Sequence, residues 1–218
     1  MSFFDDNKNI GLIVLLLGLA NIIAGIAMLI VTHDSIAGGI VFLIGYLISG
    51  FIILITGLSI HASSEKFGGI LSMLGGITGL TIAFDNQKGV VCLLLMVYGI
   101  TGIITAIFTV IAYAIWGGLG GALVSIIIAF IIGIFFIYTA TVISGDRQSS
   151  AGNILWIILL ILIILGLLGA LMLIAAAAVL GGFYLVAIII VAILTLLLMI
   201  YLLLRVLSPE IKSAMGVT

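Results

Sequence analysis

Charged residues are scarce in this chain. Lysine, arginine, aspartate and glutamate make up only 6% of its 218 residues, and the formal net charge is −1. An average soluble domain contains about 25% charged residues, so the composition excludes an ordinary soluble protein. A nucleic-acid-binding protein would also need a basic surface, which six lysine and arginine residues do not provide. We therefore expect no nucleic-acid partner.

Cysteine and proline are nearly absent as well. The one cysteine, Cys92, cannot form an intramolecular disulfide or a cysteine-based metal site. The one proline, Pro209, follows the last apolar run and predicts the end of a helix there. No phosphate loop, cluster of metal ligands or pair of nucleophile and base can be read from the spacing of residues. The sequence therefore predicts a protein that is not an enzyme and needs no cofactor or metal.

Apolar residues are what the chain has in abundance. They make up 66% of it, and the mean hydropathy is +1.66. About 20 apolar residues in a helix cross a hydrocarbon core of roughly 30 Å, and several uncharged runs of that length follow one another. Strands of a membrane barrel would alternate polar and apolar residues, and residues 154–180 do not. The sequence predicts an all-α, polytopic transmembrane helical bundle, in contact with lipid in the cytoplasmic membrane of a prokaryote.

The apolar runs divide the chain into a polar segment, 1–9, a single transmembrane domain, 10–207, and a polar tail, 208–218. The final run is divided at Gly181-Gly182, because one helix over 154–207 would be about 80 Å long. If these glycines only kink a helix, the count of spans is six. Otherwise we expect seven spans, at about 10–31, 39–60, 67–84, 90–116, 121–144, 154–180 and 183–207.

Seven spans would place the two termini on opposite sides of the membrane. Lys8 and Lys66 then lie on the amino-terminal side. The carboxyl-terminal side then has the larger group, which is Lys88, Arg147, Arg205 and Lys212. An excess of lysine and arginine marks the cytoplasmic side, so this distribution predicts a cytoplasmic carboxyl terminus.

Short similarities along the chain predict a repeated helical hairpin. Gly25, Gly79 and Gly133 are equally spaced, and the segment from Tyr46 to Ile52 matches the segment from Tyr98 to Ile104 at several positions. A hairpin over 67–116 is the unit around which we expect the others to be organised. The other units would be 10–61 and 121–180, with 183–207 as an additional span.

This pattern resembles the HdeD-like acid-resistance membrane proteins, which are built from three consecutive hairpins. The resemblance covers roughly residues 11–180. It implies a stress-related or envelope role and no particular reaction. The chain departs from the family where many members have Asn-Pro at the end of a first helix, because Asp85-Asn86 is not followed by proline. The residues that carry the resemblance are Gly25-Ile26, Tyr46 to Ile52, Gly75 to Leu80 and Tyr98 to Ile104.

Small residues within the spans predict close helix packing. Their spacing in Gly75xxxGly79 and Ala20xxxAla24 allows helix backbones to approach where lipid offers no hydrophobic drive. Asn21 is the most polar side chain inside a span, and we expect it to bond a carbonyl or hydroxyl group rather than a ligand. The full set of predicted packing residues is Ala20, Asn21, Ala24, Gly25, Gly50, Gly75, Gly79, Gly102 and Gly133.

Few residues suggest chemistry. No charged residue falls in the middle of a predicted span, which argues against a proton or ion pump. His33 and Asp34 form a candidate pH-sensitive turn, with two ordinary interfacial residues as the alternative. The short, glycine-interrupted span 67–84 could be a broken helix beside a binding site. Serine and threonine in the spans can bond back to their own helices, so they do not require a pore.

We therefore expect a non-enzymatic envelope protein that associates with itself or with other membrane subunits. One alternative is a passive pore or transporter for a small neutral or apolar solute, which needs no ionisable residue. Another is an accessory subunit of a larger membrane complex. A path lined by serine and threonine would favour the pore or transporter.

Overall fold

The computed structural model describes long helices and no strand within residues 3–31, 36–62, 86–116, 119–145, 150–180 and 183–217. Six of these helices are long and apolar enough to cross a membrane. The prediction of a polytopic helical bundle is therefore confirmed. The predicted span 67–84 lies outside the described residues. The elements are η1 (Phe3–Asp5), α1 (Asn7–Val31), α2 (Ile36–Ala62), α4 (Gln87–Trp116), α5 (Leu119–Ser144), α6 (Gly152–Leu180), α7 (Phe183–Val206) and α8 (Pro209–Ala214).

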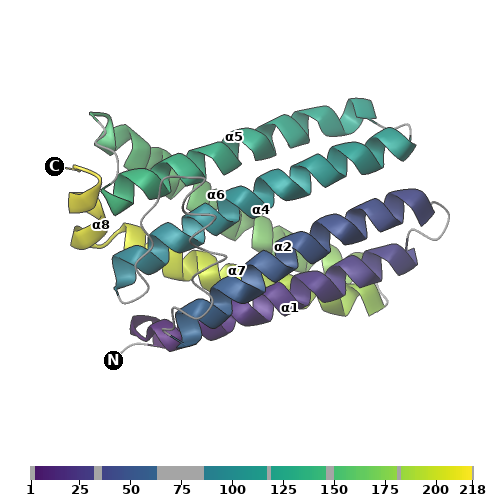
Figure 1. Ribbon diagram of the computed structural model, residues 1–218, viewed down its shortest axis with the longest axis horizontal. Coiled ribbons are helices and arrows are strands. Elements are labelled where there is room, and N and C mark those ends of the chain that lie inside the picture. Colours follow the sequence, from purple (N-terminus) through teal and green to yellow (C-terminus); the bar gives the residue numbers. More distant parts are fainter. Residues whose placement is uncertain are drawn as a thin grey trace.

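The spanning helices alternate in direction, so that both termini lie at the same end of the bundle (Figure 1). We call this the proximal end; α1, α4 and α6 begin there, and α2, α5 and α7 end there. The Arg205 guanidinium donates to the Phe4 carbonyl oxygen at 2.7 Å and to the Asp5 carboxylate at 3.0 Å. The expectation of termini on opposite sides is therefore wrong. The alternative of six spans assumed one kinked helix over 154–207, whereas α6 and α7 are separate helices, and the predicted span 67–84 lies outside the described residues. The break at Gly181-Gly182 separates α6 from α7, as expected.

Helices that are neighbours in sequence pack as antiparallel hairpins, but not all in the predicted pairs. The predicted hairpin 10–61 is present as α1 against α2. The predicted hairpin 121–180 is wrong, because α5 packs mainly against α4, and α6 packs against α7. Hairpin 67–116 includes residues outside the described part of the chain. The predicted additional span, 183–207, is thus the second helix of a hairpin.

In two of these hairpins, a reciprocal contact between glycines joins the two helices. A Cβ atom on Gly18 of α1 would lie 2.8 Å from the Gly50 oxygen of α2, and a Cβ on Gly50 would lie 3.0 Å from the Gly18 oxygen. Gly99 of α4 and Gly133 of α5 repeat this arrangement, with distances of 2.5 and 2.8 Å. Only glycine allows such an approach. By this contact α4 corresponds to α1, since each is the first helix of its hairpin. The sequence similarity had instead aligned α4 with α2, the second helix of the first hairpin.

Helix α4 forms the centre of the core. Its residues from Val90 to Val97 are all buried, which requires neighbours on every side of the helix. Helices α2 and α5 pack against it, and α1, α6, α7 and α8 also contribute buried residues to the cluster. The outer faces of the other spanning helices carry many exposed apolar side chains, as contact with lipid requires.

Polar contacts tie the elements together at the proximal end. The His61 ring of α2 bonds the Lys8 carbonyl oxygen of α1 at 2.9 Å. The Gln87 amide of α4 donates to the Asp5 carbonyl oxygen at 3.3 Å, and the Lys88 ammonium donates to the Ser144 carbonyl oxygen of α5 at 3.4 Å. The Trp156 indole of α6 donates to the Val206 carbonyl oxygen of α7 at 2.9 Å. Three of these bonds thus join the two helices of a hairpin, and the Gln87 bond joins the second hairpin to the amino-terminal segment.

The distribution of lysine and arginine predicts that the proximal end faces the cytoplasm. Lys8, Lys88, Arg205 and Lys212 all lie there, and the sequence stretches that connect helices at the distal end contain neither residue type. Cytoplasmic segments are enriched in these residues. The sequence-based assignment of Lys8 to the side opposite the other three is therefore wrong, although a cytoplasmic carboxyl terminus is still expected.

Cysteine labelling checks this orientation. Ala37 at the distal end and Ser213 at the proximal end are both exposed, and native Cys92 is only 2% exposed, so it gives little background. In intact cells, a membrane-impermeant sulfonated thiol reagent should label Ala37→Cys at least fivefold more than Ser213→Cys. After permeabilisation the two variants should label alike. Preferential labelling of Ser213→Cys in intact cells would reverse the orientation.

Candidate functional site

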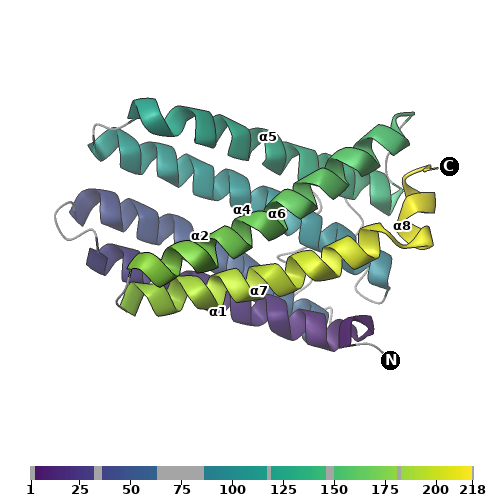
Figure 2. The ribbon, with the colours of Figure 1, turned by 180° about the vertical axis from the view of Figure 1, so that it is seen from behind.

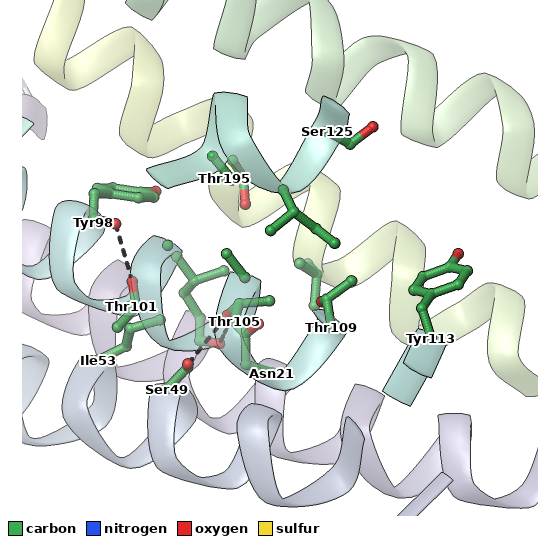
Figure 3. A pocket seen from close by; sticks show the side chains of 16 residues that line it. Asn21, Ser49, Ile53, Tyr98, Thr101, Thr105, Thr109, Tyr113, Ser125 and Thr195 are labelled. Carbon is green, nitrogen blue, oxygen red and sulfur yellow. Dashed lines mark hydrogen bonds between the residues drawn. The ribbon is translucent and has the colours of Figure 1, made fainter. Parts of the chain in front are cut away.

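A cavity of about 760 Å³ lies between the helices in the distal half of the bundle (Figure 3). Its walls come from α1, α2, α4, α5 and α7, and α4 contributes the largest share. About half of the lining side chains carry a hydroxyl or amide group, and none of the lining residues that the structure describes is charged. The lining residues are Leu17, Asn21, Ser49, Ile53, Tyr98, Thr101, Gly102, Thr105, Ala106, Thr109, Tyr113, Ser125, Ile126, Ala129, Val191 and Thr195.

The cavity extends from the middle of the helices to their distal ends. Its inner end is at Asn21, Ser49, Tyr98 and Thr195, which lie near the midpoints of their helices. Its outer end is at Tyr113, close to the end of α4. The 15 residues from Tyr98 to Tyr113 correspond to about 22 Å along a helix axis. The cavity therefore occupies the depth of roughly one leaflet of the bilayer.

Tightly packed apolar residues close the cavity toward the proximal end. Leu17, Leu94, Val97 and Leu198 are each at most 3% exposed and surround a void of about 10 Å³. Such a void holds no more than about one water molecule. The buried run of α4 continues this plug toward the proximal end. Among the described residues, the cavity is therefore a pocket that is closed toward the proximal end.

The wall between α5 and α7 is the least complete. Helix α5 makes few contacts with α6 and does not pack closely against α7. Figure 2 shows that α6 starts beside the end of α5 and diverges from it toward the distal end, where α6 lies against α7. Both Ser125 of α5, which is exposed, and Thr195 of α7 line the cavity.

Several of the polar side chains are bonded within the protein. The Ser49 hydroxyl of α2 and the Thr105 hydroxyl of α4 are 3.3 Å apart and join the two helices. The Asn21 amide donates to the Leu17 carbonyl oxygen of its own helix at 2.9 Å, and the Thr101 hydroxyl donates to the Val97 carbonyl oxygen at 2.7 Å. These bonds fix the side chains at the inner end of the cavity. The amide and hydroxyl oxygens can still accept hydrogen bonds.

The Tyr98 hydroxyl is different, because it is buried without a hydrogen-bond partner among the described residues. Figure 3 shows it directed toward Thr195 at the inner end of the cavity. A buried hydroxyl without a partner costs about 1–3 kcal/mol relative to a paired one. Tyr98 is therefore the side chain of this site with the most to gain from a ligand.

Tyr98→Phe is expected to stabilise the protein without ligand. Removing an unpaired hydroxyl should raise the free energy of unfolding by about 1 kcal/mol, and the midpoint of thermal unfolding by roughly 2–4 °C. A maleimide that fluoresces on reaction with buried Cys92 reports unfolding in detergent. The matched variant Tyr138→Phe alters a half-buried tyrosine of α5 outside the cavity and should not raise the midpoint. A lower midpoint for Tyr98→Phe would show that the hydroxyl is already paired.

The structure divides the predicted packing residues into two groups. Gly25 packs against Tyr46, and Gly50 and Gly133 form the glycine contacts described above. Ala20 and Ala24 are buried, and Ala24 clusters with Ala187 of α7. Gly102 is an incorrect assignment, because a Cβ atom there would meet nothing within 4 Å, and it lines the cavity.

Asn21 also lies in the cavity wall, although its place within a span favoured a role in packing over a contact with a ligand. Its amide bonds its own helix rather than a neighbouring one. The remaining candidates, Gly75, Gly79, His33 and Asp34, lie outside the described residues.

The sequence analysis missed most of the hydroxyl-bearing residues of the cavity. Tyr98, Thr101, Thr105 and Thr109 recur at intervals of three or four, which places them on one face of α4. That spacing was the available signal. The spacing was not read as a cavity wall because each hydroxyl can bond to its own helix. Thr101 does so, but the hydroxyls of Ser49 and Thr105 bond to each other.

The chemistry of the site is that of neutral hydrogen bonding. No cluster of three or more histidine, cysteine, aspartate or glutamate residues occurs within the part of the chain that the structure describes. The described acidic and basic side chains near α1, α4 and α7 lie at the proximal end, beyond the apolar plug. The arrangement can therefore bind an uncharged group through hydroxyl and amide contacts.

Comparison with known proteins does not add a relative. No family model, no curated protein and no solved structure matches the chain. The resemblance to the HdeD-like proteins therefore stays a prediction.

Proposed function

We propose that this integral membrane protein is a carrier that binds a small uncharged molecule in the cavity between its hairpins. The observation that supports this function is the cavity itself, because hydroxyl and amide groups line about 760 Å³ at the depth of the bilayer with no charge among the described lining residues. A path lined by serine and threonine was expected to favour the pore or transporter, and α4 provides a face with such residues.

An uncharged ligand fits this lining better than an ion. A buried charge needs an opposite charge or several strong hydrogen bonds to replace its hydration. The described lining offers no ionised partner. A neutral ligand with one or two polar groups loses much less on leaving water and can pair with the hydroxyl groups.

The closed proximal end favours a carrier over a passive pore. Carriers hold a site near the middle of the membrane and expose it to one side at a time. Here the cavity reaches the distal end, and Leu94, Val97 and Leu198 seal the other direction. The recurrence of the glycine contact in two hairpins supports the same view, since many carriers contain structural repeats.

Photolabelling tests the binding site. Two uncharged alcohols that carry a diazirine, one short and water-soluble and one with a 16-carbon chain, are irradiated with the protein in liposomes, and labelled peptides are identified by mass spectrometry. At least one alcohol should label cavity residues of α4, such as Thr101 or Thr105, in a saturable manner. Labelling by both alcohols that is confined to exposed outer residues such as Ile107 would refute the proposed function.

The self-associating envelope role and the role of an accessory subunit stay predictions. The exposed apolar side chains are explained by lipid and do not by themselves indicate a protein partner.

A further inference from the structure

We infer that the ligand is an uncharged, membrane-soluble amphiphile that reaches the cavity from the distal leaflet, through the gap between α5 and α7, with a hydroxyl or carbonyl group at its leading end. This inference rests on the proposed function and adds the chemical class of the ligand and its route.

The first observation is the position of the gap. Ser125 and Ala129 on α5 and Val191 and Thr195 on α7 line the cavity, yet these two helices do not pack closely against each other. Helix α6 packs beside α7 and approaches α5 only near the proximal end (Figure 2). A molecule dissolved among the acyl chains of the distal leaflet therefore meets an incomplete wall.

The second observation is the match between the cavity and one leaflet. The cavity begins near the midplane at Ser49 and Tyr98 and ends near the distal boundary at Tyr113. The plug at Leu94 and Val97 prevents access from the opposite leaflet. A ligand that enters from the side can thus lie along the helices at a depth that it already occupies in the lipid.

The third observation is the order of polar and apolar side chains. Near the midplane, Asn21, Ser49, Thr105 and the unpaired Tyr98 hydroxyl surround the inner end. Farther out the wall is mixed, with Thr109 and Tyr113 on α4 and with apolar Ile126 and Ala129 beside Ser125 on α5. A compact polar group can therefore be held at the inner end while an apolar body lies beside α5, which is the pattern of an amphiphile. The Tyr98 hydroxyl can donate to the oxygen of that polar group.

The final observation is that the gap lies away from the polar contacts described at the proximal end. The contacts of Arg205, His61, Lys88 and Trp156 cross-link the proximal end. The gap lies in the other half, away from these bonds. Helices α5 and α7 can therefore separate near Ser125 without breaking them.

Three probes with the same photoreactive group test this inference. The 16-carbon diazirine alcohol is compared with the fatty acid of the same chain length, which is anionic, and with the short water-soluble alcohol. The long alcohol should label residues around Thr105 at least fivefold more than the fatty acid does at a pH of about 9, where the carboxyl group of the fatty acid is ionised even in the membrane. It should also label them more than the short alcohol at equal concentration in water.

The outcomes separate the inference from the proposed function. If only the short alcohol labels the cavity, the ligand arrives from water, and the inference fails while the proposed function stands. Equal labelling by the fatty acid overturns the requirement for an uncharged ligand. If neither alcohol labels the cavity, the proposed function fails as well.

Matched substitutions on α5 test the route. Ser125→Trp places a large ring at the gap, and Ile128→Trp places the same ring at a position that is 50% exposed and outside the cavity. Ser125→Trp should reduce labelling of Thr105 by the long alcohol at least fivefold, and Ile128→Trp should leave it unchanged. Equal labelling in both variants would exclude this gap as the route.

Tyr98→Phe tests the contact at the inner end. Labelling by the long alcohol should fall about three- to tenfold, while the thermal midpoint does not fall. The corresponding hydrocarbon probe, which lacks the hydroxyl, should label the wild-type and Tyr98→Phe proteins equally. A parallel loss for both probes would show that the substitution only reshapes the cavity.

Discussion

Gly18→Ala is expected to lower the midpoint of thermal unfolding by roughly 4–10 °C, a large effect for a single added methyl group. The added Cβ atom would lie 2.5 Å from the Leu54 nitrogen and 2.8 Å from the Gly50 oxygen. Both are backbone atoms, so no side chain can rotate to make room. Helices α1 and α2 would have to separate, and overpacking of this kind costs about 1–3 kcal/mol.

The loss of close packing between α1 and α2 matters more in a membrane than it would in water. Lipid is as apolar as the helix surface, so close van der Waals packing contributes much of the association between spans. The first hairpin places Gly11, Gly18 and Gly25 along one helix against Gly50 and Gly57 on the other. A methyl group near the middle of that interface would disturb the packing along its length.

Gly169→Ala is the matched control for Gly18→Ala. Gly169 also lies within a spanning helix, α6, but a Cβ atom there would meet nothing within 4 Å. Its midpoint should stay unchanged or rise slightly, because alanine favours helix over glycine. Reaction of the buried Cys92 with a fluorogenic maleimide gives both midpoints on the same scale. Equal midpoints for the two variants would refute the role assigned to the glycine contact.

The sequence was sufficient to predict the helices themselves. A run such as 154–207 is too long for one crossing, and the break at Gly181-Gly182 follows from length and glycine content alone. Hydropathy identifies spanning helices well because every backbone polar group in lipid must be bonded within its own segment. The described boundaries of α6 and α7 agree with this argument.

The pairing of helices could not be predicted in the same way. Apart from the hydroxyl-bearing face of α4, the spanning helices are apolar around most of their circumference, so hydropathy does not indicate which face meets which neighbour. The pairing of α5 with α4 depends on the fit between Gly99 and Gly133, which are two of 28 glycines in the chain. The side of the termini depended on the count of crossings, and one span in that count was uncertain.

The candidate site shows the same limit at single residues. Gly133 and Gly102 look alike in sequence, yet Gly133 is pressed against Gly99 while Gly102 borders open space. Likewise, Thr101 bonds its own helix and Thr105 meets Ser49 of α2. Residue type and spacing placed these hydroxyl groups on one face of α4, but only the arrangement of the neighbouring helices turns that face into a cavity wall.

Gly102→Phe is expected to abolish binding while the fold is kept. The new ring would enter the cavity, because a Cβ atom on Gly102 meets no atom within 4 Å. Gly102 lies one turn from Ala106 and Tyr98, so the ring would occupy the space that the leading group of a ligand needs. Photolabelling of Thr105 by the diazirine alcohol that labels the wild-type protein should fall at least tenfold, and the Cys92 midpoint should change by no more than about 2 °C.

Gly169→Phe is the control that separates occupation of the cavity from general effects of a large side chain. It adds the same ring to a spanning helix, again where a Cβ atom meets nothing within 4 Å, but α6 contributes no residue to the cavity lining. Labelling should therefore remain at the wild-type level in this variant. If Gly102→Phe folds and still labels normally, the cavity is not the binding site. If both variants lose labelling equally, the effect comes from the membrane-embedded ring and not from filling the cavity, and the assignment of Gly102 to the ligand-facing wall fails.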